Sequence, residues 1–330
     1  MASAVVEKLK KDLNNKFGNN VIFSASDPKF ELKRIPTGCM SIDILLGGGV
    51  PLGRWVEMYG DESVLKTTLA LMAVANAQRM GFPCIYVDSE KTITKEFLEH
   101  RGVDTSPDML LIIRTETGEQ VVDILKDFIK AGEHKIIVVD SLASMLPQRE
   151  ANMELTKEAV GAQGLMTSRM TRILTAVNKT DVCIILINQT RQKIVTYGDP
   201  TTTPGGKAPK FYAGQRLRLI ASSVARGSEK VRGRRKIVSR EIIAILEKDK
   251  TGKNYGREAV IHYNVEKHII DDAQELLAAG QLSGIIKRKK LTYYIGSKGF
   301  SKANILTLLS DEKKTRKLKT KILEASLAKE

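Results

Sequence analysis

WVEMYGDESVLKTT, residues 55–68, joins an apolar run to the start of a helical pattern through a short polar turn that opens with glycine. The run 55–59 predicts a buried strand, and the apolar spacing of 66–79 predicts a helix. A glycine turn between a strand and a helix leaves backbone N–H groups free to bind phosphates, aided by the positive end of the helix. In such a loop Lys66 would reach the β and γ phosphates, and the Thr67 hydroxyl would bind Mg²⁺. The expected phosphate-binding residues are Gly60, Asp61, Glu62, Ser63, Val64, Leu65, Lys66, Thr67 and Thr68.

Three further predicted strands end in polar residues that would lie beside this loop. These strand ends are Asp140-Ser141, Asp88-Ser89-Glu90 and Asn188-Gln189. The carboxyl ends of parallel strands meet at one edge of a sheet, where the ligands of such sheets bind. We therefore expect Asp140 to support Mg²⁺, Glu90 to polarise an attacking water and Gln189 to sense a γ-phosphate. Taken singly, Asp140 could instead cap a helix, and Glu90 could be a surface acid in a loop.

Leu65 departs from the usual pattern, which has glycine immediately before the lysine. Taken alone, the loop could therefore be a chance match. With ordinary helical angles a leucine fits and can turn its side chain away from the nucleotide, whereas a positive φ would cost about 1 kcal/mol or more and distort the loop. Because Glu90, Asp140 and Gln189 are all present, we expect the ordinary angles and a working site.

Short apolar runs alternate with helical patterns from about residue 34, which predicts an α/β fold with a mostly parallel, twisted sheet flanked by helices. The predicted strands are 55–59, 84–88, 109–113, 136–140, 182–188, 217–222 and 242–248, and the predicted helices are 66–79, 118–131 and 161–178. An amphipathic helix from Val5 to Phe17 precedes this core, and the alternation ends near Tyr263. We expect a segment 1–33 with that helix and a strand at 21–23, a core of 34–265, and a small basic α/β domain of 266–330.

The composition is that of a soluble globular protein, and the distribution of its charge suggests a polyanionic partner. The 330 residues are 42% hydrophobic and 28% charged, with no apolar run long enough for a membrane span and no signal-peptide pattern. The net charge is +15, and residues 281–330 hold 13 lysines and arginines against four acids. Such a cluster favours a polyanion, although lysine-rich faces can also serve solubility alone. The three cysteines are expected to be buried and unpaired, as in a reducing compartment.

The order and spacing of these motifs resemble the bacterial recombinase family RecA, over nearly the whole chain. The resemblance is carried by residues 51–67, Asp88-Ser89-Glu90, residues 136–141 and Asn188-Gln189-Thr190-Arg191. The stretch TTTPGGKAPKFYA, 201–213, looks like the second DNA-binding loop of that family. Residues 88–104 and the bulky residue before the loop lysine are also similar to the phage recombinase UvsX, which implies a phage-encoded or phage-derived member.

The resemblance implies a RecA-like ATPase core that uses ATP and Mg²⁺. Lys66 and Thr67 would bind the phosphates and the metal, with Asp140 and Ser141 supporting the metal. Glu90 would be the general base, Phe97 would stack near the adenine, and Gln189 would pass the state of the γ-phosphate to the loop that follows it. Lys248 and Lys250 would reach the ATP site of a neighbouring subunit, so that hydrolysis depends on assembly.

The resemblance also implies two loops that contact DNA. The first, 154–161, departs from the family at Val160, and the helix after it departs at Leu165. The second runs from residue 191 to 210, and its expected DNA-binding residues are Arg191, Ile194, Gly205, Gly206, Lys207 and Lys210. Contacts with phosphates, without readers of base edges, imply binding that weakens with salt and ignores sequence.

The expected function is an ATP-dependent recombinase that forms filaments on single-stranded DNA and exchanges strands with homologous duplex DNA. Single-strand-binding and mediator proteins are further candidate partners, and the expected location is the cytoplasm of a bacterial or phage-infected cell. Two alternatives stay open: a non-hydrolysing DNA-binding or regulatory relative with an impaired loop, and a ring-forming helicase of the same fold. The N-terminal helix favours a filament, because its apolar stripe can dock on a neighbour. The basic end of the chain, 313–330, differs from the acidic tail of bacterial RecA.

Overall fold

The computed structural model describes residues 4–18, 22–28, 31–154, 161–192, 201–222, 228–231, 234–252 and 254–328. The chain divides into two compact units, Met1–Lys33 and Arg34–Glu330. The first unit contains α1 (Ala4–Phe17), none of whose residues is buried, with Leu9 55% and Phe17 63% exposed. The side chain of Asn14 bonds the N–H and the C=O of Ile22, at 2.9 and 3.1 Å, and so ties the following segment to the helix.

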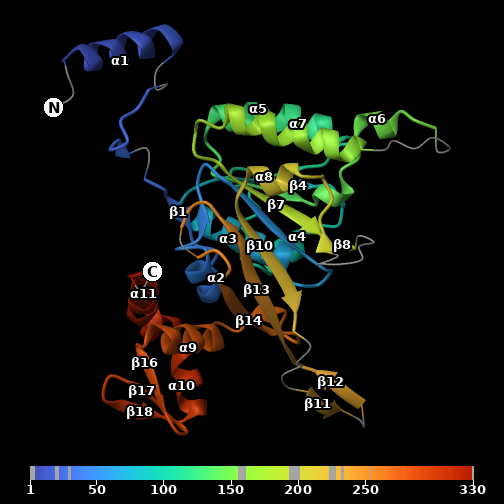
Figure 1. Cartoon of the computed structure of the whole chain (residues 1–330). Coiled ribbons are helices and arrows are strands. Elements are labelled where there is room, and N and C mark those ends of the chain that lie inside the picture. Colours follow the sequence, from blue (N-terminus) through green and yellow to red (C-terminus); the bar gives the residue numbers. More distant parts are fainter. Residues whose placement is uncertain are drawn as a thin grey trace. The chain divides into compact units, whose positions relative to one another are not determined.

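A nine-stranded sheet forms the centre of the second unit, in the order β15-β14-β13-β10-β3-β7-β6-β4-β5 (Figure 1). The six strands from β10 to β5 are parallel, and β13, β14 and β15 extend them in antiparallel fashion. The strands are β3 (Trp55–Gly60), β4 (Cys84–Asp88), β5 (Leu110–Ile113), β6 (Ile136–Asp140), β7 (Cys183–Gln189), β10 (Ala213–Ala221), β13 (Ser239–Asp249), β14 (Glu258–Asn264) and β15 (Ile269–Ile270). The predicted α/β fold with a mostly parallel sheet is confirmed.

Helices cover both faces of this sheet because alternate strand residues point into two separate cores. On one face α3 (Lys66–Arg79) packs Leu69 and Val74 into a core shared with Met58. On the other face α5 (Gly118–Ala131) and α7 (Ala162–Val177) lie side by side (Figure 1) and bury residues such as Leu125 and Met170. The sheet edge at the carboxyl ends of the parallel strands is thereby held in place from both sides.

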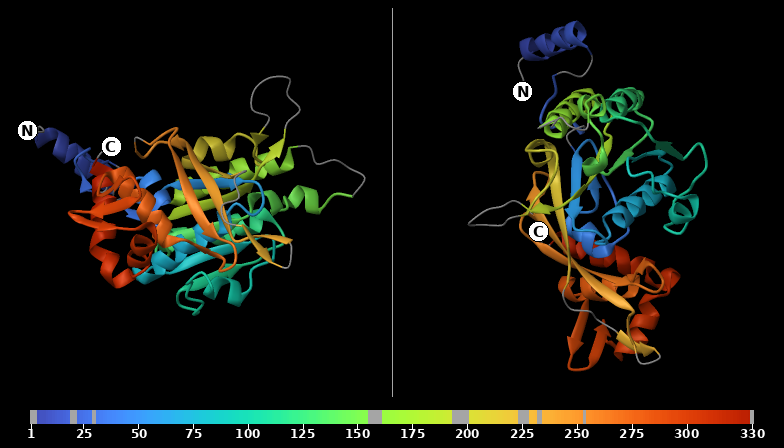
Figure 2. Two further views of the ribbon diagram at one scale, coloured as in Figure 1. Left: turned by 90° about the horizontal axis from the view of Figure 1, so that it is seen from below. Right: turned by 90° about the vertical axis from the view of Figure 1, so that its right-hand side faces the viewer.

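A third, smaller core lies in the C-terminal part of the same unit, orange to red in Figure 2. Its centre holds Leu276, Ile286 and Ile322. It is built from α9 (Asp272–Ser283), β16 (Ile286–Lys289), β17 (Thr292–Ile295), β18 (Lys298–Phe300), α10 (Lys302–Leu309) and α11 (Glu312–Ala328). The large sheet continues past residue 265, since β15 pairs with β14, and the division at that residue stays a prediction.

The remaining elements are short. They are β1 (Arg34–Ile35), α2 (Met40–Leu45), β2 (Val50–Pro51), α4 (Lys95–Glu99), the 3-10 helix Leu142–Ser144, α6 (Gln148–Ala151), β8 (Arg191–Gln192), β9 (Thr201–Thr202), α8 (Ala208–Tyr212), β11 (Ser228–Val231) and β12 (Arg234–Ile237). β10 begins at Ala213, whereas the sequence predicted a start at residue 217. The prediction was late because the buried polar residues Gln215 and Arg216 interrupt the apolar pattern of the strand. Ile22 and Phe23 lie in no strand, and Val21 lies outside the described residues.

Cys39, Cys84 and Cys183 are buried and form no disulfide, as the sequence predicted. Burial raises the pKa of all three thiols, that of Cys84 to about 12. No helix in the described ranges combines the length and the apolar character that crossing a membrane requires.

Candidate functional site

The loop between β3 and α3 carries the predicted phosphate-binding residues. Lys66, the first residue of α3, folds its side chain back and donates to the carbonyl oxygens of Gly60, at 3.0 Å, and Asp61. Burial lowers the pKa of Lys66, and the neighbouring acids, Asp140 first, oppose that effect. The ammonium group is therefore held at the mouth of the loop by acceptors that phosphate oxygens could replace.

The backbone of Leu65 shows that the expected helical angles were wrong. Its φ and ψ are 68° and 15°, in the left-handed region. This conformation costs about 1–2 kcal/mol in a residue with a Cβ. The side chain is only 8% exposed and packs in the core under α3, and burying a leucine contributes about 1.5–3 kcal/mol. Burial thus offsets the strain, which is how the loop accommodates leucine where glycine is usual.

Thr67, Tyr86 and Asp140 form a hydrogen-bonded group beside the loop. Thr67 Oγ1 and Tyr86 OH both donate to Oδ2 of Asp140, at 2.7 and 2.5 Å. Burial raises the pKa of Asp140, although both hydrogen bonds act to lower it. Hydroxyl and carboxylate oxygens suit Mg²⁺, which also takes water and phosphate oxygens, so the donor set fits the expected metal. Tyr86 was not predicted, because its place inside an apolar strand marks it as core.

Glu90 lies at the same edge of the sheet as the loop. It is exposed, and Ser141 Oγ donates to its Oε1 at 2.7 Å. The nearby carboxylate of Asp88 is buried and forms an ion pair with Arg114 at 2.7 Å, so its role is structural. Gln189 lies level with Gly60, its register partner on the adjacent strand. The structure therefore brings the predicted strand-end residues together around residues 60–68.

A cavity of about 410 Å³ opens from residues 63–68 of the loop. Its other walls include Phe97, which the sequence predicted, and Arg101, Arg240, Tyr263 and His268, which it did not. Phe97 lies in α4, and Arg101 lies four positions further along the chain, in the turn that follows the helix. The spacing was the one sequence signal for this pair.

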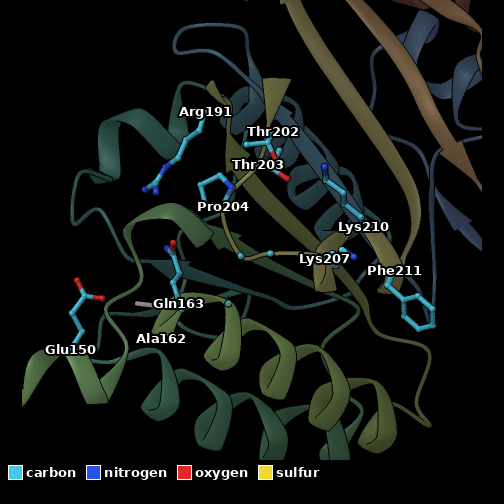
Figure 3. Close-up of a pocket in the computed structure, with 14 residues that line it drawn as sticks. Glu150, Ala162, Gln163, Arg191, Thr202, Thr203, Pro204, Lys207, Lys210 and Phe211 are labelled. Carbon is cyan, nitrogen blue, oxygen red and sulfur yellow. The ribbon is translucent and has the colours of Figure 1, made fainter. Parts of the chain in front are cut away.

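A second cavity, of about 910 Å³, lies between the start of α7 and residues 202–211 (Figure 3). The cations Arg191, Lys207 and Lys210 line it. Gly205 and Gly206 line it as well, with φ angles of 88° and 71°. Gly205 is buried and Gly206 is exposed, so the first is a packed turn residue and only the second offers its backbone freely. The predicted residues Ile194 and Val160, with the rest of 155–160, lie outside the described residues, and Leu165 is a half-exposed residue of α7.

The family model described as RecA N-terminal domain matches residues 4–270. The chain belongs to the RecA family. The protein named RecA from Thermus thermophilus is 42% identical over 216 residues, which are 64% of this chain and 63% of that relative. The RecA proteins of Sulfurovum sp. and Salinispora tropica are 35% and 38% identical, over 79% and 78% of this chain and 78% and 77% of theirs. The phage origin stays a prediction.

The two lysines that the RecA resemblance assigns to a neighbouring subunit lie near the second cavity. Lys248 Nζ donates to the carbonyl oxygens of Lys210 and Phe211, the latter at 2.9 Å. Lys250 Nζ lies 5.5 Å from the ring centroid of Phe211. Burial and then the charge of Lys250 lower the pKa of Lys248 to about 8. Neither lysine is among the described residues that line the cavity at the phosphate loop of this chain.

A buried polar network in this RecA-family core contacts the loop at the second cavity and was not predicted. Asn188, at the end of β7, donates to Glu57 Oε1 at 3.0 Å and to the carbonyl of Pro204 at 3.1 Å. Arg216 Nε donates to the other oxygen of Glu57 at 2.5 Å, and Arg216 Nη1 lies 3.4 Å from Glu247. An acid inside the apolar run 55–59 was the available signal. The network runs from the residue beside Gln189 to a wall of the second cavity.

Proposed function

We propose that this chain is a DNA-dependent ATPase that assembles as a filament on single-stranded DNA and exchanges strands with homologous duplex DNA. One observation carries the proposal: Lys66, Thr67, Asp140 and Glu90 converge at the sheet edge where the phosphate loop enters α3. Membership of the RecA family supports the same activity.

In the proposed ATP site, Lys66 and the N–H groups of the loop would hold the triphosphate, and Thr67 with Asp140 would hold Mg²⁺. The bound metal would neutralise charge on the β- and γ-phosphates. Glu90, positioned by Ser141, would accept the proton of the attacking water. Gln189 would sense the γ-phosphate at the end of β7. Lys248 and Lys250 would neutralise transition-state charge in the neighbouring subunit.

In the proposed DNA site, Arg191, Lys207 and Lys210 would neutralise the phosphates of a single strand. Ile194 would insert between bases, and the Gly205-Gly206 turn would let the strand approach the backbone closely. The contact from Asn188 to Pro204 supports a coupling between the two sites, because the same residue borders Gln189 and the loop.

The test is ATP turnover with and without single-stranded DNA for four proteins: the unmodified chain, Glu90→Gln, Lys66→Ala and Glu116→Gln. DNA should stimulate the unmodified chain. Glu90→Gln should lose about 100-fold in turnover while keeping ATP and DNA binding, as for loss of a general base, and Lys66→Ala should lose nucleotide binding. Glu116→Gln is the matched control, because Glu116 is an exposed acid after the adjacent strand β5.

The alternative expected from the sequence, a DNA-binding relative that does not hydrolyse ATP, is not favoured, because the packing of Leu65 offsets its left-handed backbone. That reading takes over if the unmodified chain binds no nucleotide at millimolar ATP and Lys66→Ala behaves identically. Near-normal turnover of Glu90→Gln would remove Glu90 from its role while leaving the ATPase in place.

A further inference from the structure

Arg101 is fixed against Phe97 inside the cavity at the phosphate loop. Its guanidinium carbon lies 3.4 Å from the centroid of the Phe97 ring, so the charged group stacks on the ring face. Nη1 donates to the carbonyl of Phe97 at 3.0 Å, and Nε donates to Thr68 Oγ1 at 3.4 Å. No described residue accepts a hydrogen bond from Nη2, although the side chain is partly buried. The arginine is therefore held in one place with a donor to spare.

The position of this pair within the cavity determines which part of a nucleotide it meets. The phosphates of a bound nucleoside triphosphate belong at Lys66 and Thr67, where the helix begins. The base is the one flat, weakly charged part of the ligand, and flat bases stack on aromatic rings. Phe97, Arg101 and Tyr263 lie along the same cavity beyond the loop, so the base would stack on a ring there and turn its edge toward the N–H groups of Arg101.

The charge of this region favours hydrogen-bond acceptors on the base. Arg101 and Arg240 line the cavity, and neither can accept a hydrogen bond. Among the described residues that line it there is no aspartate or glutamate. Adenine and guanine both present N7 as an acceptor, and guanine adds O6, whereas adenine presents its amino group at that position. Pyrimidines have no atom that corresponds to N7.

We propose that Arg101 determines base specificity: its Nη2 donates to N7 of a purine, so that the site selects purines and takes guanine as well as adenine nucleotides. This inference rests on the proposed ATP-binding function. It assigns a recognition role to a side chain that the phosphate chemistry does not use. A carboxylate that accepted from the adenine amino group would reject guanine, and none is present in the described lining.

The experiment measures the binding of Mg²⁺ complexes of ATP, GTP, CTP, 7-deaza-ATP and 7-deaza-GTP by titration calorimetry without DNA. The unmodified chain should bind GTP within about tenfold of ATP, and CTP more weakly. Replacing N7 by C–H should weaken both purines by about tenfold or more, the effect of one hydrogen bond from a charged donor. In Arg101→Met, which keeps the length of the side chain, the 7-deaza penalty should vanish. Arg172→Met, which removes an exposed charge on α7, should keep the full penalty.

The outcomes separate this inference from the function on which it rests. Binding of neither ATP nor GTP by the unmodified chain would refute the proposed function itself. Tight ATP binding with GTP more than 100-fold weaker, or a 7-deaza penalty that survives in Arg101→Met, would refute the role of Arg101 alone. If Arg101→Met does not fold, the unmodified chain still provides a test, because equal binding of ATP and 7-deaza-ATP would refute the N7 contact.

Discussion

Leu65 combines a left-handed backbone with a buried side chain, and these two properties have opposite effects on the stability of the loop. Left-handed angles favour glycine over any residue with a Cβ by about 1–2 kcal/mol. The packing of the leucine side chain against the core beneath α3 acts in the other direction and is the larger effect. The residue is therefore a compromise in which core packing compensates for an unfavourable backbone.

Replacing Leu65 separates the two effects. Leu65→Ala keeps the backbone strain and loses the packing, so it should lower the free energy of unfolding by about 2–5 kcal/mol. Leu65→Gly loses the same packing but relieves the strain, so it should be about 1 kcal/mol more stable than Leu65→Ala. This order is the reverse of the one found within helices, where alanine is favoured over glycine. Urea denaturation measures it, and an alanine variant as stable as the glycine variant would contradict the left-handed assignment.

The turn between β9 and α8 is the element that shapes the second cavity. At Gly205 an added Cβ would lie 2.7 Å from Leu142 Cδ2 and 3.1 Å from Thr167 Cγ2. At Gly206 the nearest heavy atom would be 3.8 Å away, although both glycines have positive φ. The two positions thus share a backbone requirement and differ in packing.

Alanine at each glycine tests the turn. Gly205→Ala should displace the segment that carries Lys207 and Lys210, because overpacking of this kind costs about 1–3 kcal/mol. Because both lysines would then be misplaced, the affinity for an oligo-dT strand should fall by about tenfold in Gly205→Ala. Gly206→Ala should lower that affinity less, because it changes only the preferred backbone angles. Fluorescence anisotropy at one fixed salt concentration measures both. A larger loss at Gly206 than at Gly205 would show that the exposed backbone, and not the packing, controls the loop.

Elements were predictable from the sequence where one pattern determined them. The helix Lys66–Arg79 and the strand Ile136–Asp140 have the predicted bounds, because periodicity and flanking polar residues agree there. The start of β10 was missed, since its buried Arg216 is stabilised by Glu57, a partner that is distant in sequence. The strand ends around the phosphate loop were predictable from topology. The wall of the loop cavity formed by Arg101, Arg240 and Tyr263 was not predictable, because these residues come from three separate segments of the chain.

At the scale of the whole molecule, the proposed assembly depends on the exposed apolar stripe of α1 and on Lys248 and Lys250. We predict that turnover per protomer rises with protein concentration and with DNA length, because each ATP site would be completed by the next subunit. Removing residues 1–33, the first compact unit, should leave a folded protein with little turnover. Sedimentation and ATPase assays measure this.

A point variant provides the control for that deletion. The double change Leu9→Ser and Phe17→Ser removes apolar side chains that are exposed in the single chain, so it should leave the unfolding transition unchanged while reducing assembly and turnover. A fully active monomer would rule the scheme out. The division of the remainder at residue 265 stays a prediction, which limited proteolysis would examine.

All three native cysteines are buried, so their thiols should react slowly in the folded protein. The thiolate is the form that reacts with alkylating reagents, and these thiols are both inaccessible and hard to ionise. A single cysteine introduced at an exposed position such as Lys95 would therefore be the one site that a maleimide dye modifies, with no need to replace the native three. Conversely, the rate at which Cys84 and Cys183 are labelled in the unmodified chain would measure how often the central sheet opens.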